Sequence, residues 1–272
     1  MTRVAVTPNP GVHLRVELLG RLDIRTETGS EIRLSGRHAQ ALFGLLVLVP
    51  RPRSREAIAA DLWPDADATS AGSMRQALWL VRQALIAAGI APADLLDIEG
   101  DTLGVRMDAQ VDLDITALER CLDADGCGAE EAIERYRGDL LEGLGHDCFA
   151  TERERLADRY EDALAIVAEQ RLEAGDLDGA RSAANRLLAR DPLREEAHAV
   201  LIAVHGLIGS RSQVVRQYRR LSEVLSRELG ERPLPDTEAI YRKALLETML
   251  RAQERAALIE PIHPQPLVAV GG

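Results

Sequence analysis

The sequence predicts a mainly α-helical protein of two parts, in which a small domain of helices and strands precedes a longer all-helical domain. Short strand-like runs alternate with helical patterns up to about residue 110, and every later pattern is helical. Charge divides the chain at the same place: residues 1–110 hold 12 Arg and 13 acidic residues, whereas residues 111–272 hold 21 basic and 31 acidic ones. With 46% hydrophobic and 28% charged residues, the chain has the composition of a globular protein.

These patterns predict domains at residues 12–110 and 111–255. Proline-rich ends indicate a disordered lead-in over residues 1–11 and a disordered tail over residues 256–272. The longest apolar stretch, residues 41–49, is too short to span a bilayer, and no signal peptide is visible. We therefore expect a cytoplasmic protein that makes no membrane contact.

Three strand-like runs open the first domain. Residues 14–19 and 22–26 flank a Gly-Arg pair, and residues 31–35 follow a Thr-Gly-Ser turn. Apolar and polar residues alternate in the last two runs, which places one face of each strand on a core. A small antiparallel sheet is the expected product.

Two helical segments follow the strands. Residues 37–49 carry apolar side chains at helical spacing, and Pro50 ends this helix. Ser54 is placed to cap a second helix, which ends near Trp63. The link between the two helices is short and basic.

A third helix and a hairpin complete the first domain. The helix begins at Thr69 or Ser70 and is closed by Gly89. Residues 95–98 and 102–106 then form two strands around a Glu-Gly-Asp turn. Three helices followed by a hairpin are the order of a winged helix-turn-helix, in which the hairpin is the wing.

The second domain is predicted to consist of helix pairs. We expect helices at residues 115–123, 129–136, 151–174, 177–189, 193–208, 212–229 and 236–253. A faint repeat of 34 residues relates Ala163 to Ala197, Gly175 to Gly209 and Leu187 to Leu221. A helix, a glycine turn and a second helix at this period are typical of a tetratricopeptide array. An ordinary helical bundle is the alternative.

The third helix of the first domain has two distinct faces. Its apolar face should pack on the first two helices and consists of Met74, Leu78, Val81 and Leu85. Its other face consists of Gly72, Gln76, Trp79, Leu80 and Gln83, with Arg75 and Arg82 at the flank. In a winged helix this helix usually enters the DNA major groove, where Gln can bond adenine and Arg can bond guanine or phosphate. Trp79 and Leu80 are apolar where a polar residue is usual, and fit a thymine methyl, the wing or a protein partner.

A basic stretch lies next to this helix in the predicted fold. Residues 32–55 contain five Arg and no acidic residue, and three of these Arg lie in the link between the first two helices. Such a patch can bind phosphates on an acidic protein, because distant charges are screened; a plain solvated loop is the alternative. The predicted DNA-contacting residues are Arg51, Arg53, Arg55, Ser73, Arg75, Gln76, Trp79, Arg82, Gln83 and Thr102.

No pattern in the sequence predicts an enzyme. Phosphate-binding loops and metal-ligand spacings are missing, and the six His are scattered along the chain. Three Cys without C-x-x-C spacing favour reduced thiols, with a Cys121/Cys127 pair as the alternative. We expect no catalytic residue, no cofactor and no metal.

Several segments resemble one family of bacterial regulators. Those similar to the OmpR-type winged helix of antibiotic-regulatory-protein transcription factors are residues 37–42, 54–63 and 74–78. Those similar to the bacterial transcriptional activation domain that follows it are residues 136–141, 174–176, 191–197, 217–218 and 227–230. Together they cover roughly residues 12–250.

This resemblance implies a transcription regulator, usually an activator, that binds promoter repeats and recruits RNA polymerase. It places Arg75, Gln76, Trp79 and Arg82 on the recognition helix. The expected partners are double-stranded DNA, RNA polymerase and a second copy of the chain. The alternative is a helical-repeat adaptor whose winged helix no longer binds DNA and uses Trp79 and Leu80 against a protein.

Overall fold

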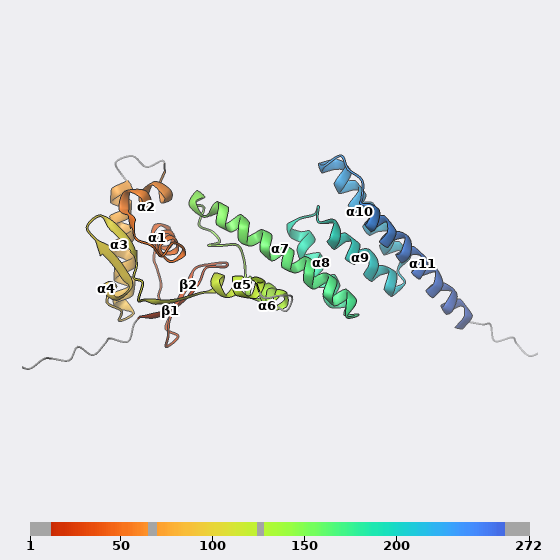
Figure 1. Ribbon diagram of the computed structural model, residues 1–272, viewed down its shortest axis with the longest axis horizontal. Coiled ribbons are helices and arrows are strands. Elements are labelled where there is room, and N and C mark those ends of the chain that lie inside the picture. The colour runs from red at the N-terminus through yellow and green to blue at the C-terminus, as the bar shows by residue number, and fades with distance from the viewer. Residues whose placement is uncertain (1–11, 65–69, 124–127, 259–272) are drawn as a thin grey trace, which may run out of the picture. The chain divides into compact units, whose positions relative to one another are not determined.

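The computed structural model describes residues 12–64, 70–123 and 128–258, and it divides into two compact units, residues 1–163 and 164–272 (Figure 1). Helices dominate both units, which confirms the predicted fold class. The predicted boundary at residue 110 lies within the first unit and stays a prediction. The predicted lead-in, Thr69, Cys127 and residues 259–272 of the predicted tail lie outside the described residues.

The first unit has the three predicted helices and the predicted hairpin in the predicted order. Its strands are β1 (His13–Glu17), β2 (Asp23–Thr26), β3 (Arg53–Ser54), β4 (Leu96–Glu99), β5 (Thr102–Val105) and β6 (Gln110–Leu113). Its helices are α1 (Arg37–Leu48), α2 (Arg55–Leu62), α3 (Ser70–Ala87), α4 (Pro92–Leu95), α5 (Asp114–Asp123) and α6 (Ala129–Arg135), then the short η1 (Asp147–Phe149) and the start of α7 (Ala150–Glu173). Ser54 caps α2 as predicted, since its hydroxyl accepts the N–H of Ala57 at 3.1 Å.

The first sheet differs from the predicted one. Its strand order is β2-β1-β6; β1 pairs antiparallel with β2 and parallel with β6, so the sheet is mixed. The predicted strand at residues 31–35 was wrong, because only an isolated bridge joins Arg25 to Glu31 there. Asp114, directly after β6, accepts the N–H groups of Leu18 and Leu19 and so fastens α5 to the end of β1.

The second sheet is the wing, and it has one strand more than predicted. Its order is β3-β5-β4, so the basic link between α1 and α2 is a strand of the wing rather than a loop. Gly104 in β5 permits this pairing: a Cβ at that position would lie 2.9 Å from the Cα of Pro52. Only a residue without a side chain lets the backbone of Pro52, directly before β3, approach so closely.

A segment that follows α6 completes the core of the first unit. Leu141 donates its N–H to the carbonyl of Leu18, and its neighbour Leu140 forms a bridge with Leu19. Leu141 is fully buried and has a φ of 50°, and a Cβ on Gly44 of α1 would lie only 2.8 Å from its side chain. Leu141 therefore packs against α1 where Gly44 leaves room for it, and Leu140 and Leu141 connect α1 with the residues that follow β1.

The second unit consists of packed helix pairs. It contains the end of α7 and the whole of α8 (Leu177–Arg190), α9 (Glu195–Ile208), α10 (Arg211–Glu228) and α11 (Pro235–Leu258). Helix α9 is central and contacts α8, α10 and α11. Tyr218 of α10 stacks on Tyr241 of α11 with ring centroids 4.0 Å apart.

The 34-residue repeat is visible in the conformation of its residues. Ala163 and Ala197 are each 1% exposed, and Leu187 and Leu221 are fully buried. Gly175 and Gly209, at the turns between helices, have φ values of 78° and 81°, a left-handed conformation that favours glycine. Each of these three positions thus has the same burial or backbone conformation in both copies of the repeat.

Candidate nucleic-acid interface

Helix α3 buries the face that the sequence predicts. Met74, Leu78, Val81 and Leu85 are all buried, and α3 packs on α1 and α2. The apolar spacing therefore fixes which side of the helix is left for solvent.

The exposed face of α3 is centred on Trp79. The exposed residues of the helix are Gly72, Arg75, Gln76, Trp79, Arg82, Gln83, Ile86 and Ala87. At 100° per residue, Trp79 lies in the middle, Arg75 and Arg82 lie on one flank, and Gln76 and Gln83 lie on the other. The Trp79 side chain is 58% exposed. More than half of this side chain is thus open to solvent and available to a partner.

Leu80 does not belong to this face, contrary to the sequence-based prediction. It is half-buried, and a Cβ on Gly36 would lie 3.8 Å from its side chain, so it packs near the start of α1. Ser73 is half-buried as well. Sequence reasoning missed Ile86, which is 54% exposed one turn beyond Arg82; its position in a run of apolar residues near the helix end hid this exposure.

The arginines near α3 differ in how much of their charge is available. Arg75 and Arg82 are exposed and have no ion pair with any described residue, and the same holds for Arg51. Arg53 instead pairs with Asp61 of α2 at 2.7 Å, and its side chain is 23% exposed. Arg55 is half-buried, and its Nε finds no hydrogen-bond partner in the described part of the chain.

The wing tip is attached to the start of α2. The carbonyl of Asp101 accepts the N–H of Arg55 at 2.9 Å, next to the β3–β5 pairing. Thr102 donates its hydroxyl to the carbonyl of Glu99, so that proton is engaged within the turn. Glu99 and Asp101 at the tip would repel phosphates. The wing sheet, including β3, is therefore joined directly to the start of α2.

A half-buried thiol lies beneath α2. Burial, with a smaller contribution from the neighbouring Asp61, raises the pKa of Cys148 to about 11. The thiol therefore stays protonated near neutral pH and is a poor nucleophile. Within the described residues, no group of three His, Cys, Asp or Glu is arranged to hold a metal ion, and no helix is both long and apolar enough to cross a membrane.

Comparison with known proteins places the chain in a family. The family model described as "bacterial transcriptional activator domain" matches residues 105–245, just over half of the chain. The chain belongs to this family. Its relatives include the transcriptional regulatory protein MoaR1 of Mycobacterium tuberculosis and of Mycobacterium bovis, each 24% identical over an alignment of 253 residues. Each alignment covers 85% of this chain and 79% of MoaR1.

A solved structure has the same fold. The structure of Mycobacterium tuberculosis EmbR in complex with a low-affinity phosphopeptide has a TM-score of 0.67 and 20% identity to this protein, and the match covers 91% of this chain and 71% of EmbR. At that identity the likeness concerns the fold. Together with the winged helix, the family membership makes the protein a DNA-binding transcription regulator.

Proposed function

We propose that α3 lies in the major groove of promoter DNA with Trp79 at the centre of the contact. One observation carries this proposal: the exposed face of α3 bears two arginines, two glutamines and no acidic residue. Arg75 and Arg82 line one edge of that face and would meet phosphates or guanine. Gln76 and Gln83 line the other edge and would bond adenine, whose N6 and N7 suit a glutamine side chain.

Trp79 would contribute an apolar contact. Its exposed ring lies between the arginine edge and the glutamine edge, where it can contact the methyl group of thymine. Such a contact adds to sequence preference without adding to the salt dependence of binding. Ser73 is placed at the margin of the same interface.

Arg51 would extend the phosphate contact beyond α3. It is exposed two residues before β3, the strand that joins the wing sheet, and no described carboxylate pairs with it. Arg53 acts mainly through its ion pair, which holds strand β3 to α2. We infer weaker phosphate contacts from Arg53, Arg55 and Thr102 than from Arg51, because their polar groups are engaged or half-buried.

We further propose that the protein is an activator that binds repeated promoter sites and contacts RNA polymerase through its helical part. Most of the net charge of −11 comes from residues 111–272, so that part would avoid DNA and remain available to protein. Two copies on adjacent repeats would bind as one avid unit, since the second contact becomes intramolecular.

DNA selected from a randomised duplex pool by the full-length protein tests the α3 interface. The Arg75→Ala/Arg82→Ala double variant should bind the selected duplex at least tenfold more weakly, because each arginine neutralises phosphate charge or bonds a base. The slope of log affinity against log salt should fall by about 2. Gel-shift titrations at several salt concentrations measure both quantities.

The matched control is Arg21→Ala/Arg120→Ala, which removes two exposed arginines from the β1–β2 turn and from α5 of the same unit. Equal DNA affinity for the wild type and the α3 variant would overturn the proposed interface. If Trp79→Ala does not change the preference for DNA sequence but abolishes binding to a protein partner, the result favours the helical-repeat adaptor.

A further inference from the structure

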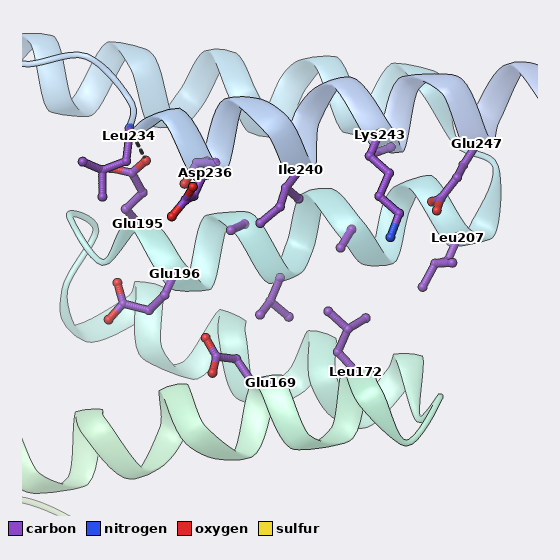
Figure 2. A pocket seen from close by; sticks show the side chains of 15 residues that line it. Glu169, Leu172, Glu195, Glu196, Leu207, Leu234, Asp236, Ile240, Lys243 and Glu247 are labelled. Carbon is purple, nitrogen blue, oxygen red and sulfur yellow. Dashed lines mark hydrogen bonds between the residues drawn. The ribbon is translucent and has the colours of Figure 1, made fainter.

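The second unit contains a pocket of about 570 Å³ that lies between three helices. Figure 2 shows side chains from α7, α9 and α11 pointing into it. Its floor is apolar and includes Leu172, Val200, Leu207 and Ile240. A close approach of α9 and α11 closes one side: a Cβ on Gly206 would lie 2.8 Å from the Cα of Ala244. The pocket is therefore large enough for several side chains of a partner.

Carboxylates surround this apolar floor. The acidic residues that line the pocket are Glu169, Glu195, Glu196, Asp236 and Glu247, and Lys243 is the basic residue among them. Figure 2 shows that these groups come from three different helices and face a common space. The resulting excess of four negative charges repels phosphates and so excludes nucleic acid as the occupant.

Two of the carboxylates already have partners within the chain. Glu195 accepts the N–H of Leu234 at 2.6 Å, which fixes the chain at the start of α11, and Glu196 pairs with Arg194 at 2.7 Å. Glu169, Asp236 and Glu247 have no hydrogen bond or ion pair from their side chains to any described residue. Three unpaired carboxylates thus surround an apolar floor.

We propose that this pocket binds a peptide segment of another protein that carries arginine or lysine beside aliphatic side chains. Its aliphatic groups cover the Leu172 and Ile240 region, and its basic groups pair with Glu169, Asp236 and Glu247. The carboxylates of the pocket would repel an acidic peptide. A basic peptide without aliphatic groups would leave the apolar floor exposed to water. This proposal concerns the second unit and does not depend on how α3 meets DNA.

Fluorescence anisotropy with three labelled synthetic peptides tests the proposal on the full-length protein. The probes are four repeats of Leu-Arg-Ala, of Leu-Glu-Ala and of Ser-Arg-Ser. We expect the Leu-Arg-Ala peptide to bind at least tenfold more tightly than the other two, because only it offers both chemistries. Equal binding of the Ser-Arg-Ser peptide would reduce the site to unspecific charge attraction and overturn the proposal, as would failure of every probe to bind.

Charge variants locate the site. Glu169→Gln/Asp236→Asn/Glu247→Gln should weaken Leu-Arg-Ala binding about tenfold, since each exposed ion pair adds a modest increment. The control Glu173→Gln/Glu223→Gln/Glu231→Gln removes three exposed carboxylates that do not line the pocket and should leave the affinity unchanged. Ala203→Arg, which adds a positive charge on the lining, gives a second test should the triple variant fold poorly. Unchanged affinity in Ala203→Arg would contradict the proposal.

A deletion and a sedimentation measurement distinguish two other possible occupants of the pocket. If the peptide binds only after deletion of residues 259–272, the carboxy-terminal segment of the chain itself fills the pocket, and the proposal is wrong. It is also wrong if the triple variant abolishes self-association in sedimentation, because a second copy is then the occupant.

Discussion

At the scale of single residues, His198 in α9 shows how a buried titratable group is held in its neutral form. The side chain is 1% exposed, its Nε2 lies 3.1 Å from the carbonyl of Pro192, and Gln217 donates to its Nδ1 at 2.8 Å. With Nε2 protonated and Nδ1 accepting, both ring nitrogens are satisfied. Burial lowers the pKa of His198 below its usual value of 6.5.

This lowered pKa predicts a loss of stability in mild acid. The unfolded chain binds the proton of His198 more readily than the folded chain does, so the free energy of unfolding falls as pH drops below 6.5 toward the lowered folded pKa. His198→Gln, which stays neutral, should show a shallower fall. Urea unfolding at about pH 7.5 and about pH 5.5 measures the difference, and His146 and His205, whose pKa values burial also lowers, contribute equally to both proteins. Parallel pH profiles for the two proteins would contradict this assignment.

At the scale of elements, Gly104 holds the three-stranded wing together. Replacing it with Ala would force its Cβ to within 2.9 Å of the Pro52 backbone, which cannot move aside as a side-chain end could. We expect Gly104→Ala to lower the free energy of unfolding by about 1–3 kcal/mol, as other overpacked sites do. It should also weaken DNA binding, because Arg51 would shift with the displaced strand.

Chemical denaturation and gel-shift titration check both effects. Gly145→Ala is the matched control: the residue is exposed and away from α3, no described atom lies within 4 Å of a Cβ there, and its φ is not positive, so the change should leave both quantities unaltered. If Gly104→Ala has the same free energy of unfolding as the wild type, the Pro52 backbone can move away from β5 without destabilising the fold, and the prediction is wrong.

The helices of this protein could be predicted from its sequence, whereas half of its strand pairing could not. Apolar spacing and caps such as Ser54 act within a few residues of the chain. The bounds that the sequence predicts for α1, α2, α3 and the repeat helices therefore lie close to those in the structure. The parallel pairing of β6 with β1 joins residues almost a hundred positions apart, and nothing local signals it. In residues 31–35 the local pattern is present without the pairing: buried and exposed residues alternate, but only Glu31 bridges to a neighbouring strand.

The candidate site shows the same division. The exposure of Arg75, Gln76, Trp79, Arg82 and Gln83 follows from the buried face of α3, which the apolar period defines. The ion pair of Arg53 with Asp61 and the burial of Leu80 depend on tertiary contacts that the period does not report. The chemical roles of these residues on DNA stay predictions.

At the scale of the whole molecule, the first unit depends on chain that lies beyond the predicted winged-helix boundary. A fragment of residues 12–110 would lack most of β6 and the buried Leu140 and Leu141. We expect it to melt at a lower temperature and less cooperatively than residues 12–163, because the edge of β1 and an apolar part of α1 become exposed. Thermal melts followed by circular dichroism compare the two fragments. Identical melting temperatures would show that residues 111–163 are dispensable.

The pairing of His13 with Gln110 has a practical consequence. It brings the two ends of the predicted winged-helix segment, residues 12–110, side by side, so this segment enters and leaves the sheet at neighbouring points. Exchanging that segment between relatives would create two junctions in one small region of sheet. The graft would succeed only where the donor also offers a glycine opposite Leu141, or where residues 138–142 are transplanted with it.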